Sequence, residues 1–90
     1  MSTLRVIVKG IVQGVSFRYF TYRVAKQFDI KGNVKNLYNG DVEIYAQAKK
    51  EYLDQFLEKI KLGPPAARVD DLQIEEVHEP ANYDSFKITY

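Results

Sequence analysis

The chain has 90 residues, of which 46% are hydrophobic and 28% are charged, and this balance is typical of a single globular domain. It contains no cysteine, which excludes disulfides, a thiolate nucleophile and a cysteine-based zinc site. No apolar run approaches the roughly 20 residues needed to cross a bilayer. Because the first residues lead directly into a strand pattern, we expect no signal peptide and a free-standing cytoplasmic domain over residues 1–90.

The net charge of +1 hides an asymmetry along the chain. Residues 1–40 contain seven basic residues and one acid, whereas residues 41–90 contain six basic and eleven acidic residues. This distribution is either chance in a small protein or a positive field around a site for anions. The long basic runs of a nucleic-acid-binding tail are missing.

The first elements are a strand and a helix. Residues 4–12 alternate in polarity, which predicts a half-buried strand with Leu4, Val6 and Val8 facing the core. A turn with two glycines follows, and residues 17–27 have helical spacing of apolar side chains. We expect Ser16 to be the N-cap and to offer its hydroxyl to the first free N–H groups of this helix.

The second half of the chain adds four strands and one helix. Strands are predicted at 31–37, 42–47, 72–77 and 85–90, with Asn39-Gly40 as a two-residue hairpin turn between the first two. A second amphipathic helix covers 50–62 and ends at Gly63. The order β-α-β-β-α-β plus a short terminal strand predicts an α+β, ferredoxin-like sandwich, with an antiparallel sheet and two helices on one face. This fold hosts many functions and indicates none of them.

The turn from Gly10 to Arg18 joins a strand to the start of a helix. Glycines allow close approach of a ligand to the backbone, and a helix start presents free N–H groups, so the turn is a candidate anion site. Arg18 adds a planar cation suited to phosphate or carboxylate. The alternative is a tight connection with a surface arginine. The turn lacks the Gly-Lys-Ser/Thr ending of a Walker motif and the glycine spacing of a dinucleotide site.

Few other residues offer chemistry. His78 is the only histidine and is interpreted as a surface residue, and Ser16 has no base at a recognisable spacing. Residues 1–28 contain no acid, which disfavours a magnesium site beside the turn. Asn36, just before the predicted hairpin, either caps that turn or is a neutral amide that holds a water molecule.

Two motifs resemble those of a known family. Residues 10–18, Gly-Ile-Val-Gln-Gly-Val-Ser-Phe-Arg, match in full the first acylphosphatase signature, G-x-V-Q-G-V-x-F-R. Residues 32–42 resemble the second signature, which includes Asn36, and residues 63–69 resemble the family's usual stretch after the second helix. The chain departs at Asn33, where an aromatic residue is usual, and at Ala48, where glycine is usual; a positive φ at Ala48 would cost about 1 kcal/mol.

The resemblance implies hydrolysis of the carboxyl-phosphate bond of acyl phosphates by direct attack of water, with no metal and no cofactor. The implied site has Arg18 and Asn36 as catalytic residues, Arg18 binding the phosphate and Asn36 orienting the water. The implied phosphate-binding loop comprises the backbone N–H groups of Gln13, Gly14, Val15, Ser16 and Phe17. A carboxylate leaving group, with a pKa of about 4, can depart without a general acid. A phosphate oxygen of the substrate can accept the proton of the water, which would explain the missing base.

Two other functions stay open at this stage. One is a single-stranded nucleic-acid module, suggested by Tyr45 on the third strand, although the first strand lacks the aromatics that such sheets use. The other is a non-catalytic module that binds small anions, and a similar module occurs in larger carbamoyl-transfer proteins. We expect a monomer that acts on a small-molecule acyl phosphate and binds neither nucleic acid nor membrane.

Overall fold

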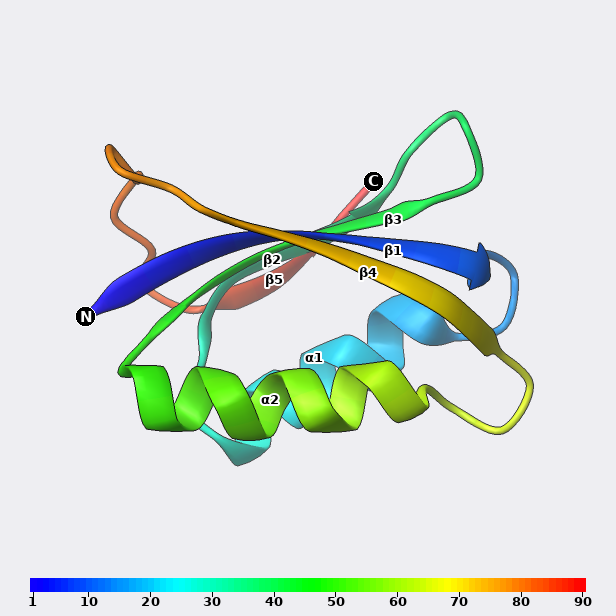
Figure 1. The fold of residues 1–90 in the computed structure, drawn as a ribbon, viewed down its shortest axis with the longest axis horizontal. Helices are drawn as coiled ribbons and strands as arrows, with labels where there is room; N and C mark the ends of the chain where they lie inside the picture. Colours follow the sequence, from blue (N-terminus) through cyan, green and yellow to red (C-terminus); the bar gives the residue numbers. More distant parts are fainter.

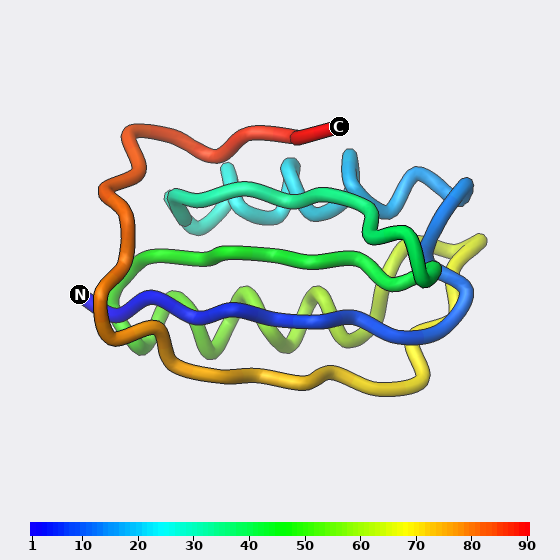
Figure 2. Tube along the Cα trace, turned by 90° about the horizontal axis from the view of Figure 1, so that it is seen from above, coloured from blue at the N-terminus to red at the C-terminus, as the bar shows by residue number.

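Two helices lie side by side on one face of a five-stranded sheet (Figure 1). The computed structural model describes residues 1–90 throughout. The elements are β1 (Ser2–Ile11), α1 (Phe17–Gln27), β2 (Lys31–Asn36), β3 (Val42–Ala48), α2 (Lys50–Leu62), β4 (Arg68–Glu76) and β5 (Phe86–Thr89). The sheet order is β4-β1-β3-β2-β5, which Figure 2 shows from above. The predicted ferredoxin-like plan is confirmed, and β5 extends the sheet by pairing parallel to β2.

The core lies between the sheet and the helices. Alternation places Val6 and Val8 of β1 and Ile44 of β3 on the covered face, where all three are fully buried. Phe17 of α1 and Phe56 of α2 pack onto them from the helical stripes. The sheet and both helices therefore hold the β1–α1 turn in a fixed place.

The open face of the sheet carries ion pairs and one pair of stacked tyrosines. Glu43 on β3 is 7% exposed and its Oε2 lies 2.9 Å from a guanidinium nitrogen of Arg5 on β1. Arg5 also contacts Glu75 on β4 at 3.3 Å. Tyr45 stacks on Tyr83 with ring centroids 6.5 Å apart. Because Arg5 and Tyr45 are already engaged within the protein, the face does not offer the free stacking platform of a nucleic-acid module.

Strand β4 begins at Arg68, so the prediction that it begins at Leu72 was wrong. It is an edge strand with mostly exposed side chains, so its first half shows no buried apolar face to reveal it. That half pairs with the end of β1 beyond an irregularity between Lys9 and Gly10. A Cβ on Gly10, whose φ is +135°, would lie 2.0 Å from the carbonyl oxygen of Arg68, so only glycine fits this crossing.

The hairpin between β2 and β3 is longer than predicted. The N–H of Gly40 donates to the carbonyl of Leu37 at 3.2 Å, and the N–H of Leu37 donates to that of Asp41 at 2.9 Å. Among the turn residues only Gly40 has a positive φ, so the Asn39-Gly40 two-residue turn is wrong and the loop is a β-turn followed by a glycine bulge. Asn39 stabilises it through its side chain, whose Oδ1 accepts the N–H of Asp41 at 3.0 Å.

Two further observations concern Ala48 and the lengths of the helices. Ala48 is 5% exposed and its φ is not positive, so the alanine carries no backbone penalty there. Neither helix is long and apolar enough to span a membrane.

Candidate active site

The β1–α1 turn is built from residues in unusual backbone conformations. Val12 is 1% exposed and anchors the turn in the core, whereas Gly14 is exposed and has a φ of +76°. Ser16 has φ 62° and ψ 26°, the left-handed conformation that residues other than glycine rarely adopt. Backbone in such turns brings successive N–H groups together into a concave site for anions.

Ser16 occupies the N-cap position, but its hydroxyl makes no capping hydrogen bond, which corrects the expectation for this side chain. Capping residues normally have extended backbone, which brings their side chain to the N–H groups of the first turn, and the left-handed conformation prevents this. The first bond at this end of α1 is donated by the N–H of Phe20 to the carbonyl of Ser16, at 3.0 Å. The backbone N–H groups from Gln13 to Tyr19 make no hydrogen bond within the protein, so a run of donors stays free.

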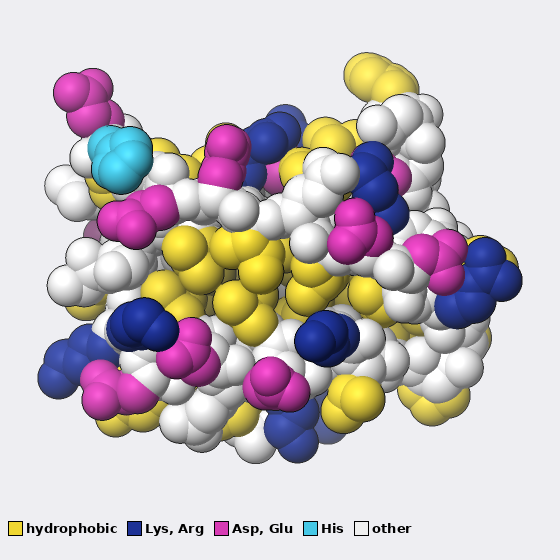
Figure 3. Space-filling view, in the orientation of Figure 1, with side chains coloured by type: hydrophobic (Ala, Val, Ile, Leu, Met, Phe, Trp, Pro, Cys, Tyr) yellow, Lys and Arg dark blue, Asp and Glu magenta, His cyan; other side chains and the backbone are white.

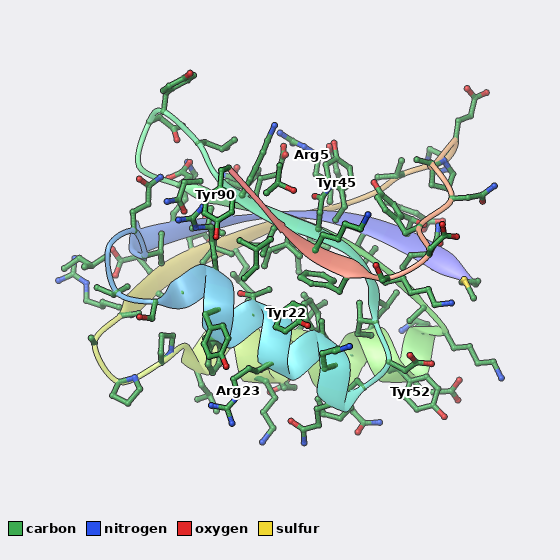
Figure 4. The ribbon with its side chains drawn as sticks, turned by 180° about the vertical axis from the view of Figure 1, so that it is seen from behind. Arg5, Tyr22, Arg23, Tyr45, Tyr52 and Tyr90 are labelled. Carbon is green, nitrogen blue, oxygen red and sulfur yellow. The ribbon has the colours of Figure 1, made fainter.

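Arg18 lies in the first turn of α1 and is held by the end of the chain. Its Nη1 donates to the carbonyl of Thr89 at 3.2 Å, and its guanidinium carbon lies 4.7 Å from the centre of the Tyr90 ring. Figure 4 shows Tyr90 between the end of β5 and the start of α1. These contacts leave the other guanidinium N–H groups available to an anion.

Asn36 ends β2 and contributes an unpaired acceptor. Its side-chain oxygen Oδ1 is buried and has no hydrogen-bond partner, and no other buried side-chain polar atom in the chain lacks one. An unsatisfied buried amide oxygen costs folding free energy, so such atoms in native proteins call for a functional explanation. Asn36 also lines the pocket described below, so its amide is a candidate for contact with a water molecule or a ligand.

Gln13 connects the turn to the hairpin that carries Asn36. Its side-chain Nε2 donates to the carbonyl of Leu37 at 2.7 Å and to that of Asp41 at 2.8 Å. Asp41 is in turn held by the ammonium of Lys9, 2.7 Å away. Since Leu37 follows Asn36 directly, these bonds fix the position of the Asn36 backbone relative to the turn.

These segments surround one pocket of about 240 Å³. It is lined by Arg18 and Asn36, by Gly14, Ser16 and Phe17 of the turn, and by Val12, Tyr19, Ile88 and Tyr90. Of the residues predicted from the sequence, Gln13 and Val15 are not among the lining residues: Gln13 holds the hairpin, and Val15 packs against the core. No lining residue is acidic, and nowhere in the chain do three potential metal-ligating side chains gather. The pocket therefore offers an anion free N–H groups, one arginine and one neutral amide.

Comparisons with known proteins agree with this arrangement. The family model described as Acylphosphatase matches residues 4–88. The chain belongs to the acylphosphatase family. It is 49% identical to the acylphosphatase of Archaeoglobus fulgidus, with the full length of both chains covered. It also superposes on the crystal structure of acylphosphatase from Bacillus subtilis with a TM-score of 0.96 at 39% identity, again over both full chains.

The chain is accordingly an enzyme that hydrolyses acyl phosphates, and its substrate is a small molecule. An acylphosphatase-like segment also occurs in a larger protein. The probable carbamoyltransferase HypF of Methanocaldococcus jannaschii is 48% identical over 94% of this chain, which spans only 11% of that protein. The relatives that match along their full length are the ones named acylphosphatase, which favours catalysis over a purely binding role.

Two features of this pocket were missed by sequence reasoning. Thr89, 71 residues away in the sequence, and the next residue, Tyr90, contact Arg18, and no local pattern signals such contacts. The side chain of Gln13 acts across 24 residues, although a glutamine followed by glycine in the turn could have suggested a side chain with a structural role. His78 is exposed, as expected, and lies outside the pocket.

Proposed function

We propose that the pocket around Arg18 and Asn36 is where this enzyme hydrolyses acyl phosphates. The free N–H groups of Gln13 to Phe17 and the Arg18 guanidinium bind the oxygens of the phosphoryl group, and the Asn36 amide orients the attacking water. The observation that carries the proposal is the convergence of unpaired donors and one unpaired acceptor on a single pocket. Donors suit the phosphate, and the acceptor suits the water.

The reaction needs little acid–base help. The oxygen of water forms a bond to phosphorus while the bond from phosphorus to the acyl oxygen breaks, and its electron pair leaves with the carboxylate. A phosphate oxygen takes the proton of the water, so a dianionic acyl phosphate gives one carboxylate and one dihydrogen phosphate ion. Charge spreads over the equatorial phosphoryl oxygens in the transition state, where preorganised N–H groups and a guanidinium stabilise it.

Steady-state kinetics on benzoyl phosphate test these roles. We expect Arg18→Ala to raise KM and lower kcat, because the guanidinium binds phosphate in both the ground state and the transition state. We expect Asn36→Ala to lower kcat by about 10²–10³-fold with a small change in KM. Lys26→Ala, which also removes a cation from α1 but at a residue outside the pocket, is the control and should keep both constants. A normal kcat in both pocket variants would exclude this pocket as the active site.

We also propose that catalysis needs no metal, that residues 1–90 act as one domain, and that the protein is a cytoplasmic monomer. The first point is supported by the absence of carboxylates among the lining residues. The single domain and the monomer are supported by a pocket that is built from one chain, and the cytoplasmic location is supported by the lack of cysteine. Turnover that survives EDTA and a monomeric mass by light scattering are the expected results.

A further inference from the structure

We infer that the groove beside the proposed active site holds the acyl group of the substrate, and that Arg23 there selects acyl groups ending in a second anion. This inference rests on the proposed function of the pocket. The groove, of about 540 Å³, lies between α1 and the loop at Pro64 and Pro65. Ser16 and Tyr19 line both the groove and the phosphate pocket, so the two cavities adjoin.

The expected path of the leaving acyl group points into this groove. In an in-line displacement the leaving group departs on the side of phosphorus opposite the attacking water. Asn36, which would hold the water, lines the pocket together with Tyr90 on the side of the sheet, whereas Ser16 and Tyr19 line it on the side of the turn and helix. Figure 4 shows Tyr90 on the sheet side of α1 and Arg23 projecting away from the sheet. The acyl group would therefore leave across Tyr19 toward Arg23.

The charge of the groove favours an anion. The chain has four arginines: Arg5 and Arg68 are paired with carboxylates, whereas Arg18 and Arg23 have no carboxylate partner. Arg23 makes a cation–π contact with the ring of Tyr19, whose centre lies 6.0 Å from the guanidinium carbon. No acidic residue lines the groove, so the Arg23 guanidinium remains free to pair with a ligand.

A second groove on the molecule differs from this one in the charge of the residues that line it. Between α2 and β4 lies an apolar hollow of about 660 Å³, visible in Figure 3, whose lining residues include four acids and one lysine. Those acids are Asp54, Glu58, Asp70 and Asp71, and Lys61 is the one basic residue that lines the hollow, although Lys50 pairs with Asp54 and Arg68 with Asp70 from its border. An anionic acyl group would be repelled there, so its binding is expected only in the α1 groove.

The spacing suits a short acyl group. An α-helix rises about 1.5 Å per residue, so Arg23 lies about 9 Å along the axis from Phe17. Tyr19 and Arg23 share one face of α1, and helical side chains lean toward the N-terminus, which brings the guanidinium closer to the phosphate pocket. A phosphate at the turn and a carboxylate on Arg23 can thus be joined by an acyl group the size of a benzoyl ring.

Two matched substrates test the inference: para-carboxybenzoyl phosphate and para-carbamoylbenzoyl phosphate, which differ in a charge but hardly in shape. We expect the wild type to have the higher kcat/KM for the carboxy compound. In Arg23→Gln the ratio of the two kcat/KM values should fall about two- to fivefold, as for one exposed ion pair. Lys26→Gln removes the same charge from the same helix outside the groove, and should keep the wild-type ratio.

The possible outcomes separate the two proposals. A ratio that is equal in the wild type and Arg23→Gln, or that falls equally in Lys26→Gln, would overturn the acyl subsite while leaving the hydrolase proposal intact. Absence of turnover with both compounds and with benzoyl phosphate would overturn both proposals. A second measurement is the salt dependence: the wild-type ratio should fall with added salt, because an exposed ion pair is screened, whereas that of Arg23→Gln should not change.

Discussion

Replacing Asn36 by alanine should make the protein more stable and nearly inactive. In the folded state the buried Oδ1 of Asn36 has no partner, and such an atom costs about 1–3 kcal/mol. Alanine removes this cost but also some packing, so we expect a net gain of about 1 kcal/mol, or about 4–8 °C in Tm for a domain of this size. Loss of the amide that would orient the water should lower kcat by about 10²–10³-fold. A residue whose loss raises stability while it abolishes turnover is retained for function.

The assay combines thermal unfolding followed by circular dichroism, without phosphate, and steady-state kinetics on benzoyl phosphate. Asn33→Ala is the matched control, because Asn33 lies on the same strand but outside the pocket. The control should show no rise in Tm and no change in kcat. A fall in Tm for Asn36→Ala would mean that the amide makes stabilising contacts, and a kcat within about threefold of wild type would refute its role in catalysis.

Variants at three other positions test separate parts of the structure. Gly10→Ala should destabilise the fold by more than about 4 kcal/mol in urea unfolding, because its Cβ would lie 2.0 Å from the carbonyl oxygen of Arg68; a small loss would show that β4 can shift. Tyr90→Ala should raise KM about two- to fivefold by releasing the Arg18 guanidinium, whereas Tyr90→Phe keeps the ring and should be close to wild type; equal KM values in all three proteins would refute this contact. Burial raises the pKa of Tyr83, so the stability that its neutral hydroxyl contributes is fully present below pH about 10 and is lost as the pH rises through the raised folded-state pKa. Urea unfolding across that range should show less loss in Tyr83→Phe than in wild type, and identical profiles would contradict the assignment.

The fold could be predicted because its signals are local. Alternation in β3 placed Val42, Ile44 and Ala46 inward, and all three are fully buried. The helical stripe of α2 was equally clear, since Phe56 and Ile60 are fully buried too. Long, periodic elements bury one face, and the spacing of apolar residues along the sequence reveals that face. The first half of β4 has no such face, because an edge strand with exposed side chains needs no apolar pattern, and its start was missed.

The site was predictable only in part, for a related reason. The turn and Arg18 are adjacent in sequence, so a helix start with two glycines indicated an anion site from local rules alone. The contact of Arg18 with Tyr90 depends on β5 pairing with β2, a long-range feature that no motif records. The left-handed Ser16 was also unexpected, because serine is usually a capping residue with extended backbone.

Departures from ordinary folding rules gather at the proposed active site. Ser16 and Asp29 are the two residues other than glycine with positive φ, and Asp29 directly follows the C-cap of α1, where left-handed backbone is a common ending. Ser16 has no such explanation; it lies within the run of free N–H groups and lines the same pocket as Asn36, whose side-chain oxygen is unpaired. Each feature costs stability by itself, and nothing in the core requires any of them. Their convergence is best explained by a ligand that satisfies them together: a phosphoryl group on the N–H groups and a water on Asn36, with Gln13 holding the two halves of the site in register.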